Sequence, residues 1–446
     1  MDLKGSNTGA TLSLNAIGQQ DTYLLNKDTE HSFFNYDIKQ HTNFSKYHKR
    51  VTVHKPTSAG PSWPFGESVK VTLNPTNMGD LLSNMYVHIN FPAVDSTSNI
   101  ADQIGRHIFE SVAMRVDELE VDKYHDDWGI IYDELYLDDS EKYTKRYTLN
   151  RNGAQGTSMI NDAALSRYPS ELMIPIPFFF SRKYESDEYS TNLPNRPYFP
   201  TCAIHKQKIE FEFKVRPITF FTNNPSTITL DTFDIITEEI TVSPEERTFL
   251  MTTEQTFITD IAKKHPTEQT IVGDNNIKLQ LVPNIPVKTL NWFFRKTVFE
   301  DENEDDGGGA TIPEKYFENR FNFTSNTSNF TTYNDFFYPV MQSAKIFVNG
   351  QDLPNIPTPQ ANYYKYVVTN NCRLSRPEKN IYTYAFSMNP INVEPSGSLD
   401  FSQLNSDRTI LDINLTGGLT DAYTLHLYYV GYQTFRFNGG FMSLAY

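Results

Sequence analysis

The sequence predicts an all-β protein built from two strand-rich halves. Phe, Tyr and Trp make up 14% of the 446 residues, and aromatic side chains fit half-buried pleated surfaces. Short runs in which apolar and polar residues alternate recur from residue 69 to residue 432, which is typical of strands with one buried face. The length suits two domains of about 200 residues each.

The clearest strand is predicted at residues 208–215, where Ile, Phe, Phe and Val alternate with Lys and Glu. This period of two places all four apolar side chains on one face of a sheet. Further strands are predicted at 69–72, 86–91, 111–121, 174–180 and 234–242 in the first half, and at 277–282, 289–294, 344–348, 383–388, 409–415 and 424–432 in the second.

Few helices are predicted. Residues 126–137 begin with acidic residues and then show apolar residues near helical spacing. Ser243 can cap a second helix at 243–251, because Pro244 suits a first turn and Glu246 stands three residues after the cap. We therefore predict a flexible arm at 1–20, a first domain at 21–242, a connecting helix at 243–251 and a second domain at 252–446.

A weak internal repeat supports this division. The segment that begins at Ser111 and reaches Tyr132 is echoed by the segment that begins at Ser343 and reaches Tyr364. The two serines are as far apart in the sequence as the two tyrosines, which suggests that one kind of domain is used twice. Residues 301–309 and 318–336 are predicted to be surface loops between strands.

Composition argues against several classes of function. A formal net charge of -15 repels phosphate, so we expect no direct binding to nucleic acid. Cys202 and Cys372 are too few for a disulfide framework and have no metal-ligand spacing. No signal peptide or membrane-spanning run is present in the sequence, which predicts a protein that is made in the cytosol.

No catalytic, metal or cofactor site is predicted. His125, Asp126 and Asp127 are consecutive, and consecutive residues rarely converge on one ion. The acidic run at 301–306 lacks the alternating spacing of a calcium loop, and no nucleophile motif is present. We therefore expect a protein that is not an enzyme and that holds no cofactor.

Asn-x-Ser/Thr motifs mark candidate glycosylation sites at Asn322, Asn326, Asn329 and Asn414, with a further motif at Asn43. Three of these motifs crowd one polar loop. A loop rich in Asn, Ser and Thr generates such matches freely, so the motifs serve mainly as loop markers.

Short motifs follow one another along the whole chain. In the first half they are 18–25 with Asp21, then Phe33 and Phe34, 41–44 with Asn43, 122–128 with Asp127 and Trp128, and 174–180 with Phe178, Phe179 and Phe180. In the second half they are 343–352 with Asn349, Gly350, Gln351 and Asp352, then Pro395, Ser396 and Gly397, and finally 442–446. In this order the motifs resemble those of the major capsid proteins of nucleocytoplasmic large DNA viruses, particularly the algal-virus type. Met78 and Ser443 depart from the family pattern, so assignment to a smaller, polinton-like relative stays an alternative.

The resemblance implies two tandem eight-stranded jelly-roll β-sandwiches with a few short helices and long surface loops. It implies a homotrimeric capsomer of pseudo-hexagonal outline that tiles an icosahedral shell, and assembly in the host cytoplasm. The implied partners are the chain itself, neighbouring capsomers, minor capsid and penton proteins, and an inner viral membrane.

Individual motif residues have structural roles under this interpretation. Asn349-Gly350 is a tight-hairpin signal and Pro395-Ser396-Gly397 a turn signal. Trp128 is expected to be a buried anchor. The triple Phe at 178–180 indicates a strand end covered on both sides, as when another subunit packs over it.

Two alternatives stay open. One is a carbohydrate-active all-β enzyme, which would need two facing carboxylates in an aromatic cleft. The other is a minor or decorating virion protein with a jelly-roll glycan-binding role.

Overall fold

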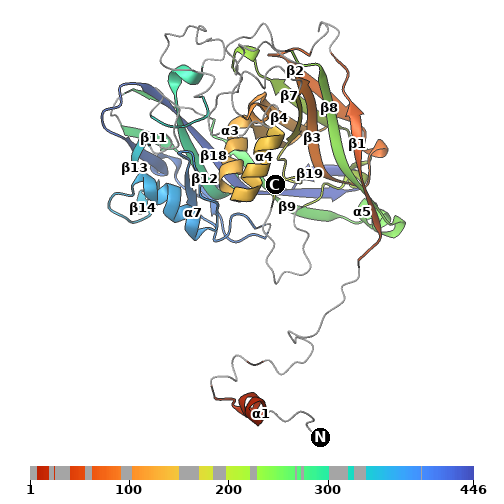
Figure 1. Ribbon diagram of the computed structural model, residues 1–446, viewed down its shortest axis with the longest axis horizontal. Coiled ribbons are helices and arrows are strands. Elements are labelled where there is room, and N and C mark those ends of the chain that lie inside the picture. Colours follow the sequence, from red (N-terminus) through yellow and green to blue (C-terminus); the bar gives the residue numbers. More distant parts are fainter. Residues whose placement is uncertain are drawn as a thin grey trace. The chain divides into compact units, whose positions relative to one another are not determined.

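Strands β1 to β8 form two four-stranded antiparallel sheets in the first half of the chain (Figure 1). The computed structural model describes residues 8–19, 25, 41–55, 63–91, 103–149, 170–183, 197–220, 229–266, 269–272, 276–300, 320–325, 338–392 and 394–445. The strands are β1 (Phe44–Thr52), β2 (Ser68–Leu73), β3 (Leu81–Phe91), β4 (Phe109–Val116), β5 (Leu119–His125), β6 (Ser170–Pro175), β7 (Ile209–Val215) and β8 (Thr232–Val242). Their order is β1-β8-β3-β6 in one sheet and β2-β7-β4-β5 in the other.

The two sheets enclose a shared apolar core. In β7 the buried and exposed positions alternate as the sequence predicts, with Ile209, Phe211 and Phe213 fully buried. These side chains join a cluster that also includes Val87 from β3 and Ile235 from β8. The two sheets and this core together are called the first sandwich below.

The predicted strand at 111–121 is wrong in one respect. The segment is a hairpin, in which β4 and β5 are joined by Asp117 and Glu118, and Asp117 has a φ of 52°. The turn contains neither Gly nor Asn, so the sequence gives little local signal for it.

Strands β9 to β19 form the second half, called the second sandwich below. They are β9 (Gln255–Lys264), β10 (Gln269–Val272), β11 (Asn276–Gln280), β12 (Pro286–Lys296), β13 (Met341–Val348), β14 (Gln351–Leu353), β15 (Tyr382–Ala385), β16 (Leu399–Asp400), β17 (Ile410–Leu415), β18 (Ala422–Asn438) and β19 (Phe441–Leu444). One sheet has seven strands, with the path β10-β18-β12-β15 and with β9, β16 and β19 attached to it; the other has the order β11-β17-β13-β14. A second apolar cluster fills the space between them, with Trp292, Leu411 and Leu427 among its members.

The two sandwiches share one strand order. The order β2-β7-β4-β5 corresponds to β11-β17-β13-β14, and β1-β8-β3-β6 corresponds to β10-β18-β12-β15. The echoed serines, Ser111 and Ser343, lie in the corresponding strands β4 and β13. The two hairpins that follow have positive φ at Asp117 and at Asn349. This correspondence supports the internal repeat that the sequence suggests.

Helices connect and cover the strands. They are α2 (Ile104–His107), α3 (Asp126–Leu135), α4 (Asp139–Leu149), α5 (Pro244–Thr252), a π-helical turn (Tyr363–Val367) and α7 (Val368–Asn371). Ser243 caps α5 as predicted, because its side-chain oxygen accepts a hydrogen bond of 3.4 Å from the Glu246 amide. The sequence did not predict α4. No helix in the described ranges is long and apolar enough to cross a membrane.

Residues 1–43 form a separate unit. Among its described residues lies helix α1 (Thr8–Asn15), with Leu12 and Leu14 exposed. The motif residues Asp21, Phe33 and Phe34 lie outside the described residues, as do 301–309 and most of 318–336.

Candidate functional site: the junction between the sandwiches

The seven-stranded sheet is buried on both of its faces. In β12, Trp292 belongs to the core of the second sandwich, whereas the neighbouring Phe293 belongs to the cluster of the first. In β18, Tyr429 lies in the second core and Tyr428 and Val430 lie in the first cluster. A sheet covered on both faces needs apolar residues at consecutive positions, which explains the run of apolar residues in both strands. We call this far face of the sheet, with the elements that cover it, the junction.

Helix α3 covers the junction from the first sandwich (Figure 1). Trp128 is 1% exposed, and its ring lies 6.2 Å from the ring of Tyr428 in β18. Backbone hydrogen bonds also link the two halves: the Ser375 amide donates to the Leu135 carbonyl at 2.7 Å. The Glu378 amide donates to the Glu134 carboxylate, also at 2.7 Å. Trp128 is therefore a buried anchor between the sandwiches.

The triple Phe lies at the same junction. Strand β6 ends at Pro175, so Phe178, Phe179 and Phe180 lie in the turn that follows and not in a strand. The Phe178 ring packs 5.8 Å from Phe211 inside the first sandwich, and the Phe179 ring packs 5.5 Å from Phe435 of β18. The covering on both sides that the sequence predicts is present. It comes from the chain itself, so the triple Phe is no evidence for a second subunit.

A buried ion pair and a charge-assisted hydrogen bond cross the junction. The Arg295 guanidinium of β12 donates to the Asp127 carboxylate of α3. Arg182 pairs with Asp122 at 3.0 Å and donates to the Asp260 carbonyl of β9 at 2.8 Å. The side chains in these contacts are at most 7% exposed. Removing one partner of such a pair would leave an uncompensated buried charge, so the pairs fix how the sandwiches meet.

The pKa values follow from burial and pairing. Burial opposes ionisation of Asp127, but Arg295 outweighs it and holds the pKa of Asp127 below its ordinary value. Burial raises the pKa of Asp122 and of Asp260, and Arg182 and Lys288 respectively offset only part of this effect. These carboxylates are held by cations inside the protein, as structural groups are.

The three residues at 125–127 have different partners. Asp126 pairs with Arg216 at 2.8 Å, while Asp127 pairs with Arg295, so the two neighbouring carboxylates point to different arginines. Burial, followed by nearby Lys123 and Lys264, lowers the pKa of His125 to about 4. Within the described part of the chain, no group of three or more His, Cys, Asp or Glu side chains could hold a metal ion.

Comparison with known proteins identifies the family. The family described as "Major capsid protein N-terminus" matches residues 32–250, and the family described as "Large eukaryotic DNA virus major capsid protein" matches residues 238–417. The chain belongs to the major capsid protein family of large eukaryotic DNA viruses. It is 24% identical to the major capsid protein of Pyramimonas orientalis virus and 22% identical to that of Paramecium bursaria Chlorella virus 1. Each alignment covers 98% of this chain and 99% of the relative.

Solved capsid structures show the same fold. A chain of the PBCV-1 virus capsid superposes with a TM-score of 0.70 at 18% identity, over 93% of this chain and 100% of that one. The faustovirus major capsid protein superposes with a TM-score of 0.64 at 10% identity, over 96% and 98% of the two chains. The predicted double jelly-roll fold is thereby confirmed. A major capsid protein is a structural component of the virion.

The second-half motifs of this capsid family form turns. Asn349 and Gly350 both have positive φ, 51° and 82°, between the paired residues Val348 and Gln351, which is the geometry of a tight hairpin. Asp352 follows and forms an ion pair of 2.9 Å with Lys345 across the hairpin. The motif at Asn349 thus has the structural role that the resemblance implies.

The Pro395–Gly397 motif also forms a turn. The Ser396 hydroxyl donates to the Asn389 carbonyl at 2.9 Å, and the Ser396 amide donates to the Tyr432 hydroxyl of β18 at 3.0 Å. Gly397 has a φ of 126°, which other residues rarely adopt. The motif therefore ties a surface turn to the central strand of the seven-stranded sheet.

The candidate glycosylation sites differ in access. Asn414 is exposed in β17, and Asn43 is exposed directly before β1. Asn322 is 2% exposed, so the folded chain gives a glycan no access to it, and the prediction at this residue is wrong. Asn326 and Asn329 lie outside the described residues. The loop composition that suggested Asn322 does not reveal that its side chain turns inward.

Sequence reasoning missed the arginines that hold the junction. Arg295 directly follows the apolar run Trp292–Phe294 of β12, Lys288 lies earlier in the same strand, and Arg182 stands two residues after the triple Phe. A charged residue within an apolar strand is the available signal, since a buried charge requires a partner. The partner itself, such as Asp127 for Arg295, is 168 residues away and could not be assigned from the sequence.

Proposed function

We propose that three copies of this chain form a capsomer of pseudo-hexagonal outline, and that these capsomers tile an icosahedral shell. The repeated strand order carries the proposal. One chain contributes two sandwiches of the same topology, so a trimer presents six similar sandwiches. A trimer with a nearly hexagonal outline can pack closely with its neighbours in a flat array.

The junction supports this proposal. A tile can form a regular array only if its two sandwiches keep a fixed relative orientation. The buried Asp127–Arg295 pair, the Arg182 contacts and the Trp128 anchor provide such fixation. An interface this apolar and this well paired behaves as a core, not as a hinge.

The domain limits follow from the same arrangement. We propose a first jelly roll at 21–242, a connecting helix at 243–251, a second jelly roll at 252–446 and an arm at 1–20. No described sheet mixes strands from the two sides of α5, which is the main support for the boundary.

The proposed partners are other copies of the chain, minor capsid and penton proteins, and an inner viral membrane, with assembly in the host cytoplasm. The acidic net charge of -15 favours contacts with basic protein surfaces over contacts with nucleic acid. We accordingly propose that the chain does not bind the genome directly and performs no catalysis.

The first experiment is the solution mass of the purified chain by light scattering, over a series of protein and salt concentrations. A species of three times 51.3 kDa is expected, and negative-stain images of that species should show pseudo-hexagonal particles. A chain that remains monomeric at every concentration and salt, and stays so after co-expression with minor capsid proteins, contradicts the proposal. That outcome would favour the decorating, glycan-binding alternative.

A further inference from the structure

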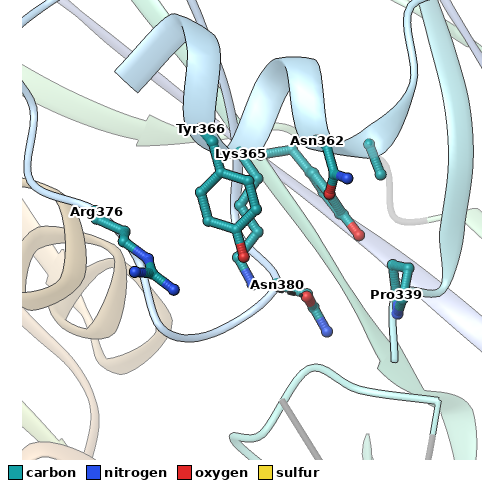
Figure 2. A pocket seen from close by; sticks show the side chains of 8 residues that line it. Pro339, Asn362, Lys365, Tyr366, Arg376 and Asn380 are labelled. Atoms are coloured by element: carbon teal, nitrogen blue, oxygen red, sulfur yellow. Dashed lines mark hydrogen bonds between the residues drawn. The ribbon is translucent and has the colours of Figure 1, made fainter. Parts of the chain in front are cut away.

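A pocket opens in the second sandwich beside the junction, since its lining residue Arg376 lies between Ser375 and Glu378, which bond to helix α3. It has a volume of about 620 Å³, within the range of sites that take small molecules. Its lining comes from the π-helical turn Tyr363–Val367 and its flank, and from the segment that leads into β15 (Figure 2). The lining residues are Pro339, Ala361, Asn362, Lys365, Tyr366, Arg376, Asn380 and Tyr382.

The charge of the lining has one sign. Lys365 and Arg376 are cations, and none of the described lining residues is acidic. This concentration of positive charge occurs in a chain whose net charge is -15. A cationic concavity inside an acidic protein attracts an anion locally, although the whole molecule repels it.

Lys365 is buried without a carboxylate partner. It is 4% exposed, and its ammonium donates to the Glu378 carbonyl at 3.0 Å and to the Asn380 side-chain oxygen at 2.9 Å. Both acceptors are neutral, and an ammonium has three N–H donors, so one donor stays available. The carboxylates of Glu134 and Glu378 act on this ammonium only through electrostatic attraction and not through a hydrogen bond, so its charge is incompletely compensated.

Arg376 supplies the second cation from the rim. Its guanidinium lies 5.5 Å from the centre of the Tyr366 ring and forms no ion pair with any other residue that the structure describes. Figure 2 shows the guanidinium and the Tyr366 hydroxyl directed into the same space, with the Asn362 amide at its other side. A planar guanidinium that rests on an aromatic ring is preorganised to bind a planar or tetrahedral anion with two N–H groups.

We propose that this pocket binds a small organic anion through a carboxylate or phosphate group, which Arg376 and Lys365 hold together. Arg376 donates to two oxygens of the anion, and the remaining N–H of Lys365 donates a third hydrogen bond to the same anionic group. The Tyr366 hydroxyl and the Asn362 amide complete the polar shell, while Ala361 and Tyr382 contact the apolar body of the ligand. The proposal is independent of the oligomeric state of the chain.

Titration calorimetry on the full chain at constant ionic strength tests the proposal, with inorganic phosphate and benzoate as separate probes. At least one probe should bind to the wild-type chain, and the stronger one identifies whether the group is phosphate or carboxylate. Arg376→Gln should weaken that binding by about tenfold to a hundredfold, the usual effect of losing a charge-assisted contact. Arg376 is exposed, so this variant should fold normally.

Arg408→Gln is the matched control, because Arg408 is an exposed arginine of the same sandwich outside the pocket. It should bind the probe as tightly as the wild type does. Absence of binding by both probes overturns the proposal, as does an equal loss of affinity in Arg376→Gln and Arg408→Gln.

A pH series adds a readout specific to Lys365. Burial lowers its pKa to about 8, while Glu134 of α3, and Arg376 and Glu378 of the adjacent segment, act on it electrostatically. Benzoate keeps a single negative charge above neutral pH, so its affinity should fall as the pH rises from 7 to 9 and Lys365 loses its proton. In Lys365→Met the affinity should be low at both pH values. An affinity for benzoate that does not change with pH in the wild type would exclude Lys365 from the site.

Discussion

Strands β8 and β18 occupy the same place in their sheets, yet their outer faces differ. In β8, Phe233 and Ile235 point into the core, whereas Asp234 and Glu238 lie on the opposite face. In β18, apolar side chains occupy both faces, because the opposite face packs against the first sandwich. The same strand position can therefore carry apolar residues on one face or on both faces. Apolar residues on both faces indicate a strand that is packed on both sides.

The ion pairs of the two faces differ in the same way. Glu238 is paired with Lys46 of the edge strand β1; the Lys46 side chain is 48% exposed, whereas that of Glu238 is 6% exposed. At the junction, Arg295 and Asp127 are both 4% exposed. Water can reach the half-exposed Lys46 but not Arg295, so loss of the lysine should affect stability less than loss of the arginine.

The largest effect is expected at the junction. Arg295→Met leaves Asp127 charged and buried, and should lower the free energy of unfolding by about 3–5 kcal/mol. Chemical denaturation, followed by both fluorescence and circular dichroism, measures this loss. Non-coincident transitions from the two probes would show in addition that the sandwiches no longer unfold together.

The double variant Asp127→Leu/Arg295→Met is the matched control. It removes both charges and should recover much of the stability, since apolar replacements of a buried pair are often neutral. If the single and double variants are equally unstable, packing and not the uncompensated charge is responsible, and the proposed difference between the two faces is wrong.

A smaller effect concerns pH. The pKa of His125 is lowered to about 4 by burial beside the junction, so below about pH 6.5 the unfolded chain binds a proton that the folded chain does not. Stability is therefore lost as the pH falls from 6.5 to 4. His125→Gln should reduce that loss by about 3 kcal/mol, measured by denaturation at both ends of the range. A loss that is equally steep in the wild type and in His125→Gln would contradict the burial argument.

The two corresponding hairpins allow a comparison of backbone strain. Gly350 has a φ of 82°, and a Cβ at this position would meet no atom within 4 Å. Gly350→Ala should therefore cost about 1 kcal/mol through conformation alone. Glu118 stands at the corresponding place in the first hairpin, where only Asp117 has positive φ. Glu118→Ala should change the thermal midpoint little, and a comparable loss in both variants would show that the hairpins are under the same constraint.

The smallest effect is expected on the outer face. Lys46→Gln removes the half-exposed cation of a pair whose carboxylate, Glu238, is buried, and should cost about 1 kcal/mol. The carboxylate of Glu238 keeps donors from Ser83 at 2.6 Å and from Asn84 at 3.1 Å. A loss above about 2 kcal/mol in denaturation would show that this face is as sensitive as the junction, and would remove the contrast between the sheets.

The fold was predictable wherever local pattern and burial agree. The alternation at 208–215 predicted β7, and the Ser243 cap predicted α5. The prediction failed where a local rule was incomplete: the Asp117–Glu118 turn carries no glycine, and the triple Phe lies beyond the strand that it was assigned to.

The junction could be predicted only in part. The apolar run at 424–432 lies in β18 and is consistent with a strand covered on both faces. The ion pairs join residues far apart in sequence, so no local pattern could match Asp127 with Arg295. The family resemblance supplied the double jelly roll but not the side chains that join its two parts.

The central position of β18 has a consequence for the newborn chain. Arg295 follows Asp127 by 168 residues, and β18 lies later still. At translation rates of about 5–20 residues per second, Asp127 waits roughly 10–30 s for its partner to leave the ribosome. Until β18 is made, which takes longer still, Trp128 and Phe179 lack the side chains of Tyr428 and Phe435 that pack against them, so the unfinished chain presents a defined apolar surface.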